Sequence, residues 1–385
     1  MHLFHIYSLD MKILVCGDFV PINRGVSHVN NSSAINTDVK RIISNHDLKI
    51  VNLEAPIAEN SSYNKIVKDG PHLCTSPSTV QYLSTCGFNC VTLANNHFYD
   101  FGSDGVNNTL NAVNKFMGGR KIGGGITIEE QRSPFVIQNE KIVIFNYCES
   151  ESSVGHPYGS NRLDPITAYY DISNAKAKEN FVIVIIHGGH EGYQLPSPRM
   201  KSLYHFLVDC GADVIINHHQ HCFSGYENYK GSMIFYGLGN FYFDAFFKHG
   251  FIPNGWNEGY MVSLDIVDKK LISHEIIPYE QCKGLEPIVR LMNEEENNSF
   301  NNRIKELNQI IADDNLISEH FKMFSDTKVS DVLRNLSPYS NKWLLRLYNR
   351  KLLPFNISKN KAAVILNMIR CESLRDVCMS VLSKI

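Results

Sequence analysis

Hydrophobic and polar positions follow two alternating patterns over residues 11–277. Short apolar runs, which predict strands, alternate with stretches whose apolar residues recur at helical spacing. The predicted strands are residues 12–16, 48–53, 89–93, 181–186, 213–216, 233–236 and 260–266, with a hairpin over 135–147. The predicted helices are residues 38–45, 78–86, 104–116 and 199–210. Strands that alternate with helices favour an α/β fold built on a mixed sheet.

The pattern changes after about residue 282. From there to the end, the chain is rich in Leu, Asn, Lys and Glu, and almost no strand signal remains. Helical spacing is clearest at Ile304, Leu307, Ile310 and Ile311. The sequence therefore predicts three parts: a lead over residues 1–10, which is either disordered or precedes the true start at Met11, an α/β domain over 11–282, and a helical C-terminal region over 283–385.

Composition and charge narrow the class of protein. Hydrophobic residues make up 43% of the 385 and charged residues 20%, so the chain can bury a core and fold. Because 37 basic residues meet 39 acidic ones, we expect no nucleic-acid partner. No apolar run reaches the roughly 18 residues of a membrane span, and no secretory signal is visible. We therefore expect a cytoplasmic protein whose ten cysteines, none in a C-x-x-C pair, are reduced and mostly buried.

Polar residues that could bind metal follow the predicted strands. The carboxyl ends of parallel strands meet at one edge of a sheet, which is the usual ligand crevice. Residues of this kind lie within four positions of an apolar run at Asp18, Glu54, Asn96, His187, His219 and His221. Oxygen and imidazole donors without thiolate suit Mn, Fe, Zn or Mg. The sequence thus predicts two divalent metal ions, with manganese as the first choice.

Each donor has a role that two adjacent cations would require. Glu54 is the candidate bridging carboxylate, because an anion between the ions offsets their repulsion. Asp18 would bind the first ion, and the neutral oxygen of Asn96 would bind the second. The remaining imidazoles would complete the two ligand sets. Taken singly, Asp18 could instead be a turn or cap residue, and an isolated H-x-H could be structural.

His97 directly follows Asn96 and is left free of metal in this scheme. It could protonate a leaving oxygen or stabilise the transition state as a cation. Asp100 could orient its imidazole. Three further residues have a less specific signal: His190 and Glu191 would line the pocket or support His187, and Asn240 would contact substrate or a ligand. The alternative for all three is an ordinary loop or turn position.

Six stretches resemble a known family. They are CGDFVP (16–21), VNLEAPI (51–57), LANNHFYDFG (93–102), HGGHE (187–191), GADVIINHHQH (211–221) and FYGLGNFYFD (235–244). In this order they resemble the CapA (poly-gamma-glutamate capsule biosynthesis) family of calcineurin-like metallophosphoesterases. The resemblance implies a four-layer αββα sandwich with a two-metal site. It also implies metal-ligand roles for the six donors named above and a catalytic role for His97.

Some positions depart from the wider pattern of these enzymes. Their first motif is D-x-H, but Val20 stands where the histidine would be, so the first ion would lack one imidazole. The family's HWG-x-E stretch lacks its tryptophan here, and Asn217 stands where a glycine usually precedes the paired histidines. Family members often carry an N-terminal membrane helix, which this sequence lacks.

Residues 342–361 carry six basic residues and no acid, interleaved with Trp, Tyr and Leu. Such a stretch could contact an anionic membrane surface or an assembly complex, which would place the protein at the inner face of the membrane. The alternative is that its apolar side packs on the protein while the charges stay solvated.

The sequence favours a metal-dependent hydrolase. Its substrate would be a small-molecule phosphoester or a polymer-linked intermediate, poly-gamma-glutamate or capsular glycan, in cell-surface polymer biosynthesis. The alternative is a non-catalytic, metal-binding accessory protein that organises a capsule or polymer assembly complex. A metal-dependent nuclease would share the site, but the near-neutral charge counts against it.

Overall fold

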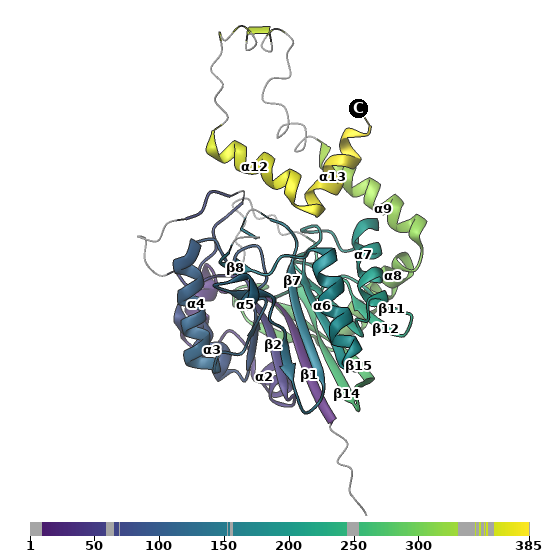
Figure 1. Ribbon diagram of the computed structural model, residues 1–385. Coiled ribbons are helices and arrows are strands. Elements are labelled where there is room, and N and C mark those ends of the chain that lie inside the picture. The colour runs from purple at the N-terminus through teal and green to yellow at the C-terminus, as the bar shows by residue number, and fades with distance from the viewer. Residues whose placement is uncertain are drawn as a thin grey trace, which may run out of the picture.

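Two mixed sheets form the centre of the computed structural model (Figure 1). The structure describes residues 10–58, 65–68, 70–151, 153–154, 157–244, 254–329, 343, 346–347, 350, 352 and 358–384. The predicted lead lies outside these residues except for Asp10, which begins the first strand. The predicted α/β class is confirmed.

The larger sheet has eight strands within the described residues. Its order is β16 (Val289–Leu291), β15 (Lys270–Gln281), β14 (Glu258–Val267), β1 (Asp10–Val20), β2 (Leu48–Leu53), β3 (Cys90–Thr92) and β4 (Lys121–Ile122), and β13 (Asn240–Phe243) also pairs with β1. Strands β1 to β4 run parallel, whereas β14 is antiparallel to β1.

The smaller sheet has six strands within the same residues. Its order is β11 (Tyr226–Tyr229), β12 (Ser232–Phe235), β10 (Val214–His218), β9 (Phe181–His187), β7 (Ile142–Cys148) and β6 (Phe135–Ile137). The central strands β7, β9, β10 and β12 are parallel. The predicted hairpin is confirmed as the antiparallel pair of β6 and β7. A small third pair joins β5 (Gly124–Gly125) to β8 (Gly159–Ser160).

The helices of the described residues are α1 (Arg24–Asn30), α2 (Thr37–Ser44), α3 (Pro77–Thr85), α4 (Gly102–Met117), α5 (Ile128–Arg132), α6 (Pro165–Ala177), α7 (Pro198–Asp209), α8 (Glu294–Ile311), α9 (Asp314–Thr327), α12 (Lys359–Arg370) and α13 (Glu372–Leu382). Two of the longer ones begin with a polar cap followed by proline. Asp164 accepts a hydrogen bond from the Thr167 amide, and Ser197 accepts one from the Met200 amide. Proline suits the next position, since its missing N–H would be unpaired there anyway.

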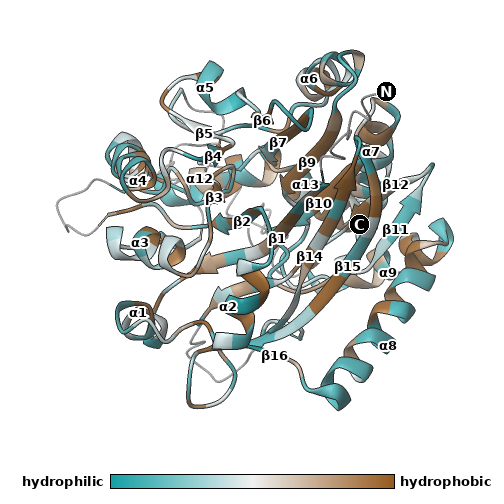
Figure 2. Cartoon of the chain, turned by 90° about the horizontal axis from the view of Figure 1, so that it is seen from below, coloured by the Kyte–Doolittle hydropathy of each residue, from teal (hydrophilic) through white to brown (hydrophobic). Residues whose placement is uncertain are grey.

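Three apolar clusters hold these elements together. Ile13 and Ile50 of the larger sheet pack against Ile144 and Ile183 of the smaller one. Helices α2, α3 and α4 cover the outer face of the larger sheet, and α6 and α7 cover that of the smaller sheet. Figure 2 shows the apolar strands lying between these two groups of helices. Because the central strands are buried on both faces, their sequences are continuous apolar runs.

The C-terminal region corrects one predicted boundary. Residues 283–385 were expected to be helical, but Val289–Leu291 forms β16 and pairs with β15, so the sheet continues to residue 291. Two further strands, β13 and β15, were not predicted. Much of β15 is exposed and polar, and β13 is only four residues long, so neither produces a clear apolar run.

Helices α8, α9, α12 and α13 pack on the α/β domain. The ammonium group of Lys201 on α7 donates to Ile311 O at 2.6 Å and to Asp314 Oδ1 at 2.7 Å, which fixes the junction of α8 and α9. Met368 of α12 and Val377 of α13 join the apolar cluster under α7. Figure 1 shows α12 and α13 lying across one end of the two sheets.

Three other sequence predictions can be placed. Most of residues 342–361 lie outside the described part of the chain, so their predicted membrane or assembly contact stays a prediction. None of the helices that the structure describes is long and apolar enough to cross a membrane. All ten cysteines are described and free, and all but Cys74 and Cys210 are buried, as expected.

Candidate metal centre

The candidate ligands lie at the carboxyl ends of strands from both sheets. Asp18 belongs to the last part of β1, and Glu54 directly follows β2. His187 and His218 are the last residues of β9 and β10 in the smaller sheet. The topology therefore brings donors from two sheets to one edge, as the sequence predicted for parallel strands.

Gly17 allows β1 to present Asp18 at this edge. The pairing of β1 with β2 shifts register between Cys16 and Asp18. At Gly17 the backbone passes so close to Gly239 that a Cβ atom would lie 1.9 Å from its carbonyl oxygen. A side chain at position 17 would push the two segments apart and displace the carboxylate next to it.

Four of the predicted ligands converge around one ring nitrogen. His187 Nε2 lies 3.0 Å from Asn96 Oδ1, 3.0 Å from His219 Nδ1 and 3.3 Å from Glu54 Oε1. All four side chains are buried. Donor atoms this close, drawn from four segments, form the set that the sequence predicted for the second metal ion.

The second set of donors surrounds Asp18. His221 Nδ1 lies 3.5 Å from Asp18 Oδ2, and His221 Nε2 lies 3.8 Å from Glu54 Oε1. Glu54 is therefore near both sets, as a bridging carboxylate must be. Sets of three donors whose ligand atoms all lie within 4.8 Å of one another are Asp18, His187 and His218, and Glu54, His219 and His221. The shorter distances instead associate His187 with Asn96 and Glu54.

His218 is a candidate ligand that the sequence interpretation missed. Its Nδ1 lies 3.7 Å from Asp18 Oδ1, and its buried Nε2 has no hydrogen-bond partner among the described residues. Val20, which replaces the histidine of the D-x-H motif, packs in an apolar cluster with Phe243 and Trp256. His218 thus offers an imidazole to Asp18 where position 20 offers none.

The backbone around the paired histidines is held in an unusual conformation. His219 has φ 88° and His221 has φ 55°, both in the left-handed region that side chains other than glycine rarely adopt. Between them, the Gln220 amide donates to Tyr193 O at 2.9 Å. Asn240 Oδ1 lies 2.8 Å from His221 Nδ1, and the Asn240 amide donates to His221 O at 3.0 Å. Asn240 is fully buried, so its predicted role is resolved in favour of holding His221 and against contacting substrate.

The electrostatics of the two carboxylates differ sharply. Burial, together with the charge of Asp18, raises the pKa of Glu54 well above its usual value. Neither oxygen of Glu54 has a hydrogen-bond partner among the described residues. Burial also acts to raise the pKa of Asp18, but the histidines around it outweigh burial and lower that pKa. Without a cation, a buried and unpartnered carboxyl such as Glu54 is costly to ionise.

His97 and Asp100 form the predicted pair beside these donors. His97 Nδ1 lies 2.7 Å from Asp100 Oδ2, and Asp100 is also bonded by the Leu73 amide at 2.8 Å. Lys68, which the sequence interpretation missed, donates to Asp100 Oδ1 and lies 3.1 Å from His97 Nδ1. Burial and then Lys68 lower the pKa of His97, although Asp100 opposes them. Since Nδ1 is engaged, Nε2 is the atom left for a substrate.

Asn217, the departure from the usual glycine, has a structural explanation. Its amide donates to Gly188 O at 2.8 Å and to Tyr236 O at 3.0 Å, and its oxygen accepts from the Tyr204 hydroxyl at 2.6 Å. These bonds tie the end of β10 to the segments after β9 and β12. The side chain therefore braces the segment that carries the histidines.

A cavity of about 330 Å³ opens beside the donors. Asn96, His97 and His219 line it, together with the predicted residues His190 and Glu191. His190 is buried against Phe321 and Phe324, with ring centroids 5.2 and 5.7 Å away, and burial lowers its pKa to about 4. Glu191 is exposed. Both therefore face the cavity, and neither makes a printed hydrogen bond to His187.

Glu151 is a further residue that the sequence interpretation missed. Its Oε1 lies 3.6 Å from His219 Nε2, on the opposite side of the ring from the nitrogen that faces His187. A carboxylate behind a ligand histidine favours the tautomer that turns the other nitrogen toward a metal ion. The donors, the unpartnered Glu54 oxygens and this supporting carboxylate together fit two divalent cations.

The fold and the site define an α/β protein with two adjacent sets of candidate metal ligands at one edge of paired sheets. The profile of the family described as "Bacterial capsule synthesis protein PGA_cap" matches residues 12–245. The chain belongs to this family, which confirms the resemblance drawn from the motifs. The matched residues include every candidate ligand.

Curated relatives carry names from the same field. The chain is 31% identical over 219 residues to "Capsule biosynthesis protein CapA" of Bacillus anthracis, covering 54% of this chain and 53% of that protein. It is 29% identical over 226 residues to "PGA biosynthesis protein CapA" of Bacillus subtilis strain 168, covering 57% and 59%. A "Probable polyglutamine synthesis accessory protein" of Mycobacterium tuberculosis is 26% identical over 253 residues, covering 60% and 65%. The matches thus span about half to two thirds of these relatives.

Proposed function

We propose that this chain is a metal-dependent hydrolase with two divalent metal ions, manganese as the first choice. The observation that carries the proposal is Glu54, whose two buried oxygens lack hydrogen-bond partners among the described residues while lying between two sets of donors. A buried carboxyl with no partner is rare unless a cation or a catalytic role accounts for it. The ligands would be Asp18, Glu54, Asn96, His187, His219 and His221, with His218 added beside Asp18.

Bound divalent ions would supply Lewis-acid activation of the reacting group and would make water more acidic. The side chains would set how strongly they do so. Asp18 and Glu54 supply two negative charges, and Asn96 supplies a neutral oxygen, so the positive charge of two dications would not be fully offset. Asn240 and Glu151 hold the rings of His221 and His219 from behind.

His97 would manage the proton at the leaving group. Asp100 accepts a hydrogen bond from Nδ1–H, which leaves Nε2 to face the cavity and donate to a leaving oxygen. Lys68 keeps Asp100 ionised by donating to its other oxygen. Burial and Lys68 lower the pKa of His97, so its imidazolium would release a proton readily.

For the substrate, we propose a phosphoester or a polymer-linked intermediate in the biosynthesis of poly-gamma-glutamate or a related capsule polymer. Family membership and the names of the Bacillus relatives support this field. The name of the mycobacterial relative favours a second candidate, a metal-binding accessory protein of polymer synthesis. The His97–Asp100 pair favours the enzyme, because an accessory protein would need no oriented imidazole beside its metal ions.

The test measures metal content by elemental mass spectrometry together with turnover of p-nitrophenyl phosphate and bis(p-nitrophenyl) phosphate in added manganese. Three proteins are compared: the wild type, the double variant Glu54→Ala/His219→Ala, and the surface double variant His274→Ala/Glu275→Ala. The surface variant is the matched control, because it removes the same two residue types from an exposed part of β15.

We expect two equivalents of metal and turnover in the wild type and the control, and loss of both in the site variant. A His97→Gln variant should keep its metal and lose most turnover, because a general acid contributes roughly 10²–10⁴-fold. Metal binding without turnover on either ester would favour the accessory role. Absence of bound metal after manganese loading would refute the two-metal proposal.

A further inference from the structure

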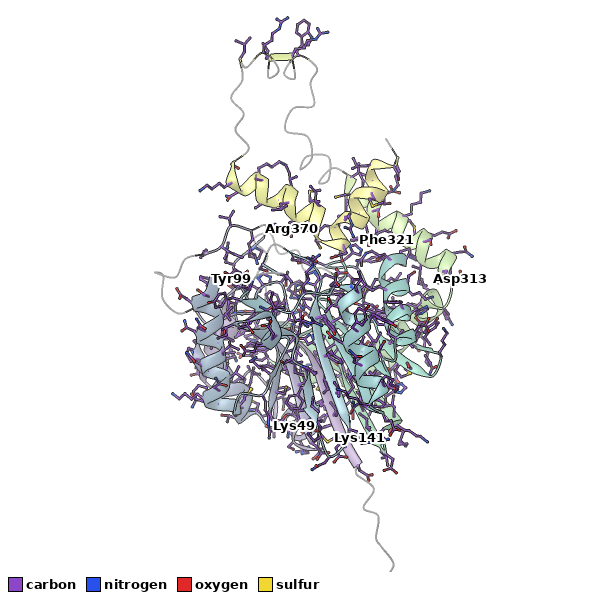
Figure 3. The ribbon with its side chains drawn as sticks, in the orientation of Figure 1. Lys49, Tyr99, Lys141, Asp313, Phe321 and Arg370 are labelled. Atoms are coloured by element: carbon purple, nitrogen blue, oxygen red, sulfur yellow. The ribbon has the colours of Figure 1, made fainter. Side chains whose placement is uncertain are left out.

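The cavity beside the candidate metal centre has two unlike walls. One wall carries Asn96, His97 and His219 from the α/β domain. The other is apolar and comes from the C-terminal helices, with Met368 from α12 and Leu374 and Val377 from α13. Figure 1 shows these two helices lying over the end of the sheets, and Figure 3 shows Arg370 and Phe321, from α12 and α9, on the same side of the molecule.

This apolar wall is attached to the residues that support the metal centre. Arg199 donates to Asp376 Oδ2 of α13 at 2.5 Å and to Glu149 Oε1 at 2.7 Å. Ser373 of α13 also donates to Glu149, which accepts from the Gly189 amide close to His187. The Cys371 thiol, at the cap of α13, lies 3.6 Å from the carboxylate of Glu151 that supports His219.

The wall is a property of this chain beyond the family match. The profile of the family ends at residue 245, whereas α12 and α13 span residues 359–382. The candidate ligands are thus shared family residues, and the opposite wall of their cavity is built from a separate part of the sequence.

We propose that α12 and α13 form a specificity wall that selects an anionic ester carrying an apolar chain or ring. The proposal rests on the proposed hydrolase function and names its substrate class. The metal side carries Glu151 and Glu191, so the charged head must be an anion that metal ions bind, such as a phosphoryl group. The apolar side chains contribute by burying hydrocarbon, whereas a strand of free carboxylates there would lose hydration without compensation.

The test uses the full-length, manganese-loaded protein and non-hydrolysable phosphonates. Binding of methyl-, butyl-, hexyl- and phenylphosphonate is measured by calorimetry, so that the alkyl and aryl arms separate a chain from a ring. Full burial of a methylene strengthens binding about fourfold, so butylphosphonate should bind up to roughly fiftyfold more tightly than methylphosphonate. Met368→Gln and Leu374→Gln should remove most of this gain and leave methylphosphonate binding unchanged.

Met379→Gln is the matched control, since Met379 lies on α13 with its side chain exposed. It should keep the full gain. Melting temperatures identify a variant that fails to fold, and if buried Met368→Gln does so, the half-buried Leu374→Gln decides the outcome.

Two results would overturn the specificity wall while leaving the hydrolase intact. One is methylphosphonate binding with no gain from either the alkyl or the aryl group. The other is a gain that survives both wall variants. A failure of every phosphonate to bind the metal-loaded protein would instead overturn phosphoester hydrolysis, and the specificity wall with it.

Discussion

The state of Glu54 gives the sharpest prediction, through the substitution Glu54→Gln. The substitution keeps the shape of the side chain and removes its ability to become an anion. In metal-free protein, burial and Asp18 already disfavour the ionised carboxylate, and neither oxygen has a partner among the described residues. We therefore expect Glu54→Gln to leave the metal-free stability unchanged or to raise it by up to about 2 kcal/mol, the cost of an unsatisfied buried group.

In manganese the effect should reverse. A metal present at about 100 times its dissociation constant stabilises the native state by about 2.7 kcal/mol. If loss of the bridging charge weakens binding 100-fold or more, the same free metal concentration would stabilise the variant by no more than about 0.4 kcal/mol. The structure thus predicts a loss of roughly 2 kcal/mol of metal-induced stabilisation.

The assay is urea unfolding at 25 °C with chelator and with manganese, followed by tryptophan fluorescence. Trp256 is a suitable probe because its ring lies 5.1 Å from that of His221. Glu275→Gln, an exposed carboxylate on β15, is the matched control and should behave as the wild type in both conditions. Equal metal-induced stabilisation in Glu54→Gln and the wild type would refute the bridging role.

Three further substitutions test other parts of the structure. Asn217→Ala removes three buried hydrogen bonds and should lower the free energy of unfolding by about 2–4 kcal/mol; a loss below about 0.5 kcal/mol in urea would contradict its bracing role. His190 has a pKa of about 4 in the folded protein against an ordinary 6.5, so its contribution is complete above pH 6.5 and is lost as the pH falls toward 4, by about 3 kcal/mol in all. His190→Phe should therefore lose less stability between pH 7 and 4.5 in chelator, and equal losses in urea titrations would refute this. Arg199→Met leaves Glu149 and Asp376 without their shared cation, so α13 should detach more readily by about 3 kcal/mol, seen as faster hydrogen exchange in residues 372–382 with little change in α3. Unchanged exchange there would show that the apolar contacts alone hold α13.

The sequence predicted the parts of the site that depend on local pattern. Asp18, Glu54 and His187 each follow an apolar run, and strand ends in an α/β sheet gather at one edge. The structure brings these residues within a few ångströms of one another. The helix starts at Pro77 and Pro198 were likewise close to prediction, because polar caps and proline act within a few residues.

Residues that the sequence interpretation missed act across long separations. Lys68 reaches Asp100 over 32 residues, and Glu151 reaches His219 from a segment with no recognisable pattern. His218 could have been found, since it adjoins His219, but the H-x-H spacing directed attention to its neighbours. No periodicity indicates that α13 contacts the site, because that contact depends on how residues 294–327 fold back over the smaller sheet.

The candidate ligands belong to two sheets, and this has a kinetic consequence. The His219 amide bonds to Asp18 from 201 residues away, so the site is complete only when both sheets have formed and joined. Contacts that close so long a loop usually form late in folding. Bound manganese should therefore slow unfolding while leaving the refolding rate nearly unchanged, which stopped-flow experiments with and without chelator would measure. On this account the metal ions would act as a clasp that closes last and delays the separation of the two sheets.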